Sequence, residues 1–213
     1  MPTTPDRTQR TDHLRMIGFV ALAVIAAAVV GCGADDTGDT SGNDAGNDAV
    51  EAVDVAGSLT QTTACAACGG NCTEESWVYG TPYHDTAPIS YAESPPAGGT
   101  HDPCWHPWGA HPAGVPARRF VHNLEHGGLI LAYECPEGCA ADVAALEKAA
   151  EASGRPYIVT PFTGMPARIV AVAWNHRLLT NCVDEAAIVA FAKAYCPGAP
   201  EQFSDGPGPS CMP

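Results

Sequence analysis

Short apolar runs and amphipathic segments alternate along the second half of the chain. Residues 128–134 (GLILAYE) form an apolar run opened by glycines, and residues 168–174 (RIVAVAW) show the alternation of a strand. A β-branched and aromatic run precedes Pro161, and a turn at residues 175–176 is followed by a returning strand. Four strands are therefore predicted, at residues 128–134, 157–160, 168–174 and 177–180.

Two amphipathic helices are predicted between and after these strands. The first covers residues 140–152 and stops at Gly154, and the second is capped by Asp184 and stops at Pro197-Gly198. Both have apolar side chains at helical spacing. The order β-α-β-β-α predicts an α+β fold, in which helices cover one face of a mainly antiparallel sheet in a ferredoxin-like arrangement.

A long segment rich in Pro and Gly, residues 81–119, precedes this second half. Histidines and tryptophans are interleaved in it: His84, His101, Trp105, His106, Trp108 and His111. A long irregular segment in a compact domain is either functional or poorly ordered. The aromatic side chains and nearby cysteines indicate that this one is pinned. Its polar side chains would then lie at fixed places, as a binding loop requires.

The N-terminus predicts export. Arg7, Arg10 and Arg15 precede an apolar run at residues 16–30, which is short, rich in Ala and ends in small residues, as a secretory signal does. Its end, VVGC, resembles a bacterial lipobox, in which the cysteine, here Cys32, is lipidated and becomes the mature N-terminus. A plain signal peptide or an uncleaved anchor is the alternative.

Three regions follow from this pattern. Residues 1–31 are expected to be a lipoprotein signal peptide. Residues 32–63 contain acidic, Gly, Asn and Thr residues without Lys or Arg, and are expected to be a disordered tether. Residues 64–213 remain as a single domain. Lipidated Cys32 would anchor this domain to the bacterial cell envelope, at the outer membrane or at the outer face of the inner membrane.

The charge balance narrows the partners. The chain has a formal net charge of −14, and the predicted domain has no stripe of Lys and Arg. Nucleic-acid binding requires such a basic surface, so we expect no nucleic-acid partner. An acidic domain is compatible with the capture of a cation.

The chain has ten cysteines, nine of them besides Cys32. In an exported domain these predict disulfides, at least three of them within the chain, although the pairing cannot be deduced from the sequence. Cys65-x-x-Cys68 can instead be a redox pair, or a ligand cluster together with Cys72. No strand is predicted before Cys65, as a thioredoxin-type motif would require. A leftover cysteine would matter most at Cys104, which lies among histidines.

The most specific motif is VHNLEHGG, at residues 121–128. It places two imidazoles four residues apart, with a carboxylate beside the second. Residues i and i+4 share a face in a helix and in a strand. His122 and His126 can therefore converge on one ion, with Glu125 close by, under either secondary structure.

Several motifs together resemble the bacterial domain family DUF3105. They are SPPAGGTH at residues 94–101, HNLEHG at residues 122–127, and a closing strand and helix that end near Glu201. The resemblance covers most of the predicted domain. It implies an exported or membrane-attached domain without an established activity, and it adds His101 to His122 and His126. The chain departs from the family pattern in its many cysteines, in His106 and in His111.

A metal-binding module is the first functional hypothesis. The ligands would be His101, His122 and His126, with a fourth from Glu125, His106, Cys104 or water. Imidazole suits copper, zinc and nickel, so we expect one copper or zinc ion. Met165 is expected to fill space in the core rather than to bind a metal.

Two alternatives remain. HNLEH fits the H-x-x-E-H motif of inverted zinc peptidases, in which Glu125 would activate water. That chemistry needs a substantial helix, which Gly127-Gly128 and the preceding Pro-rich loop disfavour. In the other alternative, the domain is a structural or interaction module. His122, His126 and Glu125 then form hydrogen bonds with the backbone, and the glycines permit a bulge.

Overall fold

The computed structural model describes residues 50–51 and 58–202. The expected signal peptide, Cys32 and most of the expected tether lie outside the described residues. The strands are β1 (Val50–Glu51), β2 (Ser58–Cys65), β3 (Gly70–Trp77), β4 (Ile89–Ser90), β5 (Gly109–Ala110), β6 (Leu129–Tyr133), β7 (Tyr157–Pro161), β8 (Ile169–Ala173) and β9 (His176–Thr180). The helices are α1 (Ala117–Glu125), α2 (Ala140–Ser153) and α3 (Glu185–Tyr195), with short 3₁₀ turns at Ala66–Cys68 and Cys196–Gly198.

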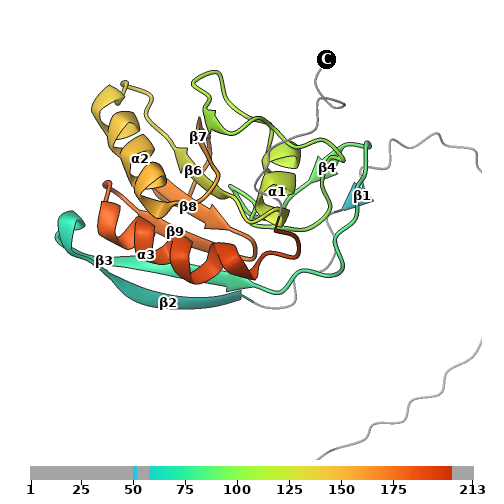
Figure 1. The fold of residues 1–213 in the computed structure, drawn as a ribbon, viewed down its shortest axis with the longest axis horizontal. Coiled ribbons are helices and arrows are strands. Elements are labelled where there is room, and N and C mark those ends of the chain that lie inside the picture. The colour runs from blue at the N-terminus through green and yellow to red at the C-terminus, as the bar shows by residue number, and fades with distance from the viewer. Residues whose placement is uncertain (1–49, 52–57, 203–213) are drawn as a thin grey trace, which may run out of the picture. The chain divides into compact units, whose positions relative to one another are not determined.

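A seven-stranded sheet with the order β2-β3-β9-β8-β6-β7-β5 organises the described residues (Figure 1). Its pairs are antiparallel except β6 with β7 and β5 with β7, which are parallel. The predicted α+β class and the mainly antiparallel sheet are confirmed. The four predicted strands are β6 to β9, and the two predicted helices are α2 and α3. Asp184 caps α3 as expected, since its carboxylate accepts from the backbone N–H of Ala187.

The ferredoxin-like detail is not confirmed. β6 and β7, which α2 connects, are direct parallel neighbours in the sheet. The ferredoxin-like arrangement is a split βαβ unit, in which another strand separates the two parallel strands. The predicted elements are therefore present in the predicted order along the chain, but they are arranged differently in the sheet.

The central strands have apolar side chains on both faces of the sheet, because successive side chains of a strand point to opposite faces. Helices cover both of these faces. On one face, Leu131 and Ala171 pack with Leu146 of α2 and Ile188 of α3. Figure 1 shows α2 and α3 together on that face. On the other face, the alternate strand residues pack with α1 through Phe120, Val121 and Leu124. The prediction of helices on one face thus holds for α2 and α3, whereas α1 was not predicted and covers the other face.

The sheet begins earlier in the chain than the sequence indicated. β2 begins at Ser58 and pairs with β3 along its whole length. Residues 58–63, which were assigned to the tether, therefore belong to the sheet. Their polar composition suits a strand at the edge of the sheet with one partner, because most of their side chains face solvent.

Disulfides brace these elements. The pairs are Cys65–Cys72, Cys68–Cys182 and Cys135–Cys139, and Cys104 is also disulfide-bonded. The expectation of at least three bridges is met. Cys65 and Cys68 bond to different partners, so they form neither a redox pair nor a ligand cluster with Cys72. Within residues 50–51 and 58–202, Cys196 is the free cysteine, and it is buried.

None of the helices in the described part of the chain combines the length and hydrophobicity needed to span a bilayer.

Candidate metal centre

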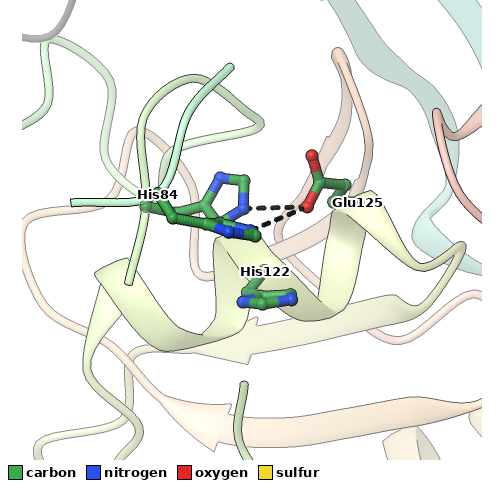
Figure 2. Close-up of side chains that lie close together, drawn as sticks. His84, His122 and Glu125 are labelled. Carbon is green, nitrogen blue, oxygen red and sulfur yellow. Dashed lines mark hydrogen bonds and ion pairs between the residues drawn. The ribbon is translucent and has the colours of Figure 1, made fainter. Parts of the chain in front are cut away.

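The HNLEHG motif lies on α1, a helix of nine residues that follows Pro116. Phe120, Val121 and Leu124 are fully buried against the sheet, which fixes the rotation of the helix about its axis. His122 and Glu125 of this helix lie close to His84, which a separate loop contributes (Figure 2). The sequence pattern does not predict this helix, because its apolar stripe covers only two turns.

The two glycines of the motif end the helix. The Gly127 N–H donates to Leu124 O, and the Gly128 N–H donates to Asn123 O, both at 3.0 Å. This pair of bonds is a Schellman motif, which requires a left-handed residue that Gly supplies. Gly127 has that conformation, with φ of 79°. The glycines thus limit the helix to nine residues, in line with the expectation that no substantial helix forms here, and they form a helix end rather than the bulge of the structural alternative.

Two loops bring further histidines to α1. His84 and His101 form an isolated parallel bridge, in which the His101 N–H donates to Tyr83 O and the Asp85 N–H donates to His101 O. The neighbouring Asp102 N–H donates to Arg118 O, at the start of α1. Residues that are far apart in the chain are thereby held against one helix.

His84, His101, His122 and Glu125 form one cluster, whose four potential ligand atoms all lie within 4.8 Å of one another. Figure 2 shows the imidazoles grouped beside the Glu125 carboxylate. Oε2 of Glu125 lies 2.9 Å from Nε2 of His101 and 3.5 Å from Nε2 of His84. His101, His122 and Glu125 are buried, whereas half of the His84 side chain is exposed. The cluster is therefore enclosed on the protein side and reached from solvent past His84.

Backbone carbonyls fix the orientation of the two buried rings. Nδ1 of His101 donates to Gly99 O at 2.8 Å, and Nδ1 of His122 donates to Asp102 O at 2.7 Å. In metal sites, such a bond sets the tautomer that leaves Nε2 as the ligand. Nε2 of His101 faces the Glu125 carboxylate, and Nε2 of His122 faces Nε2 of His126.

The hydrogen bonds of His101 define its proton content. Its Nδ1 faces a carbonyl and its Nε2 faces the Glu125 carboxylate, and neither oxygen can donate once the carboxylate is ionised. Both ring nitrogens carry a proton when both bonds are made. In this arrangement a proton occupies the position between His101 and Glu125 that a bound cation would take.

The cluster shifts the pKa values of its members in directions that favour a cation. Burial lowers the pKa of His122, and the neighbouring imidazoles lower it further, so its ring is neutral near pH 7. Burial raises the pKa of Glu125, but the hydrogen bond from His101 and the surrounding imidazoles outweigh burial, so its pKa lies below its ordinary value. The site thus combines a neutral imidazole with an ionised carboxylate.

The structure brings together three of the four predicted ligands, His101, His122 and Glu125. His126 lies next to them, with its Nε2 2.8 Å from Nε2 of His122, but it belongs to a second group with Glu125 and Glu201. His84 lies in the Pro-rich segment and is not among the ligands that the sequence predicts. His84 reaches the cluster because its loop pairs with the loop that contains His101.

The other candidate ligands lie outside the cluster. Cys104 is disulfide-bonded, so it offers no thiolate. His106 packs edge-on against His111, with ring centroids 4.4 Å apart. Met165 packs against the apolar core next to α1, as expected.

The geometry does not favour the H-x-x-E-H peptidase hypothesis. Glu125 is the last residue of a nine-residue helix. Its carboxylate is bonded to His101, whereas a general base must be available to a metal-bound water. His122 and His126 lie within direct hydrogen-bond distance of each other rather than on two sides of an ion site.

Fold and cluster define the class: a disulfide-braced α+β domain with a buried histidine–carboxylate cluster at the end of one helix. The chain matches the family model described as "Protein of unknown function (DUF3105)" over residues 84–207. This match covers more than half of the chain, so the protein belongs to that family. The matched region contains His84, His101, His122 and Glu125. No curated protein and no solved structure matches the chain.

Proposed function

We propose that this protein binds a transition metal ion through His84, His101, His122 and Glu125. The observation that carries the proposal is the orientation of the two buried imidazoles. Both donate from Nδ1 to a backbone carbonyl, which leaves Nε2 as the potential ligand atom, and both rings lie in one cluster with the Glu125 carboxylate. Elements from three parts of the chain converge to produce this arrangement, which is what preorganised metal ligands require.

The donor set favours zinc or copper. A set of three imidazoles and one carboxylate suits Zn²⁺ and Cu²⁺ better than Mg²⁺ or Ca²⁺, because imidazole is a ligand of zinc and copper sites. A closed, cysteine-rich set would indicate a structural ion. Here the cysteines are used in disulfides, and one ligand, His84, is half exposed. The arrangement supports a site that exchanges its ion with solvent.

We also propose that the protein is exported and anchored to the cell envelope. The VVGC sequence at residues 29–32 and the acidic, Gly-rich segment after it support a lipoprotein whose domain is tethered to the bacterial envelope through Cys32. Disulfides are compatible with an oxidising compartment. Cys32→Ser is expected to release the protein from the membrane fraction or to block its processing. Unchanged fractionation with an unmodified, cleaved N-terminus would contradict the lipoprotein proposal.

A structural network is the second candidate, and one observation favours it. His101 and Glu125 satisfy each other as an ion pair, and His122 is bonded at both nitrogens. The cluster therefore has its hydrogen bonds without an ion. Under this hypothesis, the domain serves as a structural or interaction module of the envelope.

Metal analysis of the full-length protein, produced in an oxidising compartment, separates the two candidates. We expect Zn²⁺ or Cu²⁺ to bind, with His101→Ala and His122→Ala each lowering the affinity at least a hundredfold. His176→Ala is the matched control, since His176 stacks on Tyr195 outside the cluster and should leave the affinity unchanged. Each variant is checked for folding by circular dichroism. A folded wild-type protein that binds neither metal would favour the structural network.

Binding should also release a proton. The ion replaces the proton between His101 and Glu125, so affinity should fall as the pH falls. Titration of the wild-type protein with Zn²⁺ in two buffers of different protonation enthalpy measures this proton directly. The same titration of Glu125→Gln, which loses a charged ligand, should show weaker binding and a smaller proton release.

A further inference from the structure

A second group of potential ligands adjoins the first. Ligand atoms of Glu125, His126 and Glu201 also lie within 4.8 Å of one another. Nε2 of His126 is 3.6 Å from the Glu201 carboxylate, and Glu125 belongs to both groups. One carboxylate therefore stands between a site of three imidazoles and a site of one imidazole and a second carboxylate.

Glu201 is held at this place by its backbone. Its N–H donates to Glu125 O at 2.9 Å, at the last residue of α1. The next residue, Gln202, donates from its side chain to Cys196 O and Ala199 O. None of these bonds uses the Glu201 carboxylate. The carboxylate lies 3.6 Å from Nε2 of His126, and the side chain is half-exposed to solvent. The position of Glu201 thus does not depend on its own ionisable group.

The contact between the two histidines indicates how the groups are linked. Nδ1–H of His122 is committed to Asp102 O, so the proton shared by His122 and His126 belongs to Nε2 of His126. A cation that takes the lone pair of His122 removes the acceptor of that proton. The other neutral tautomer of His126, with its proton on Nδ1, then presents Nε2 toward Glu201 and Glu125.

We propose that the protein holds two divalent cations, bridged by the Glu125 carboxylate. This inference rests on the proposed metal site and extends it. His84, His101 and His122 hold the first ion, and His126 and Glu201 hold the second. Carboxylate-bridged pairs of this kind are about 3.5–4 Å apart. The second site, with two carboxylates and one imidazole, is the harder of the two, and its donors suit a divalent ion such as Zn²⁺ or Cu²⁺.

Stoichiometry tests the proposal. Full-length protein is dialysed against excess Zn²⁺, and bound zinc is measured by elemental analysis. We expect two equivalents in the wild type and one in Glu201→Gln. Glu137→Gln, at an exposed position in the loop between β6 and α2, is the control and should retain two. Because the Glu201 backbone bond survives the substitution, the variant should fold.

The alternative results are distinct. One equivalent in both the wild type and Glu201→Gln overturns the second site and leaves the proposed function intact. Two equivalents in both place the second ion elsewhere and overturn the inference. No bound zinc in the wild type overturns both proposals.

Electron paramagnetic resonance tests the bridge independently. Two Cu²⁺ ions bridged by one carboxylate couple magnetically, so the second equivalent should reduce the signal that the first produces. In Glu201→Gln, the signal of the first equivalent should persist when more copper is added. A second equivalent that doubles the wild-type signal would show two separate ions and would overturn the bridged arrangement.

Discussion

Asn123 offers the sharpest test of how the candidate site is supported. Its side chain is fully buried on α1, and its amide forms two hydrogen bonds with the backbone of His106. Oδ1 accepts from the His106 N–H and Nδ2 donates to His106 O, both at 2.8 Å. The amide thus bonds both backbone groups of His106, as a neighbouring strand would. Asn123→Ala removes both bonds and leaves two backbone groups unsatisfied.

The expected cost follows from these two groups. An unsatisfied backbone group costs about 1–3 kcal/mol when it is fully buried. His106 is half-buried, so we take the lower part of that range, about 1 kcal/mol for each group, and add a smaller contribution for the cavity left by the amide. The total is about 2–3 kcal/mol. For a domain of this size, that corresponds to a decrease in Tm of roughly 5–10 °C.

Urea denaturation with intact disulfides, followed by tryptophan fluorescence, measures this change. Asn181→Ala is the control: exposed Asn181 accepts one long bond, of 3.3 Å, from the Arg168 N–H, and its loss should cost less than about 1 kcal/mol. Asn123→Asp keeps the acceptor but places an oxygen opposite His106 O, so it should destabilise at least as much as Asn123→Ala. A folded Asn123→Ala protein within about 0.5 kcal/mol of the wild type would refute the role of this amide.

Three further predictions concern the frame around the cluster. In Gly128→Ala, the new Cβ would lie 2.5 Å from the Trp108 ring and 2.8 Å from Asn123 O, so urea denaturation should show a loss of about 1–3 kcal/mol, whereas Gly198→Ala, with open space at its Cβ, should be nearly neutral. Burial lowers the pKa of His126 to about 4 from its ordinary value of 6.5. The unfolded chain therefore binds more protons between these values, and the metal-free protein should lose up to about 3 kcal/mol of stability as the pH falls from 6.5 to 4, with a shallower dependence in His126→Asn. Replacing both cysteines of the 68–182 pair by Ser, which opens a loop of 114 residues, should lower the denaturation midpoint more than the same change in the 135–139 pair, which closes a loop of 4. The loop-entropy difference is about 3 kcal/mol, and equal losses would contradict it.

The sequence predicts the elements whose periodicity is local. β6 to β9, α2 and α3 each have enough apolar side chains at regular spacing to be recognised alone. β2 and β3 were missed because their residues are mostly polar: they are strands because they pair with each other and, through β3, with β9. The hairpin of β2 and β3 joins the rest of the sheet through β9, which lies about a hundred residues further along the chain, and periodicity does not reveal this pairing.

The site was predicted only in part, for a related reason. His122, Glu125 and His126 are close in sequence, so their proximity follows from the helix or strand period. His101 was added by resemblance to a family, and His84 was not chosen at all. Its place depends on the bridge between the loops at residues 84 and 101, and Glu201 depends on a backbone bond to the end of α1. Such contacts between irregular segments have no sequence period.

The residues of HNLEHG divide into two sets, and only one is explained by the fold. Asn123 ties down a loop, Leu124 fills the core, and Gly127 ends the helix.

His122, Glu125 and His126 are each less than a tenth exposed, and none contributes to the apolar core. Burying ionisable groups is costly, and apolar residues of similar volume often stabilise a protein at least as well. A purely structural role would be met more easily by apolar side chains at these three positions. Three ionisable groups at the end of one short helix, facing two more histidines and a second carboxylate, are the arrangement that the proposed cation site requires.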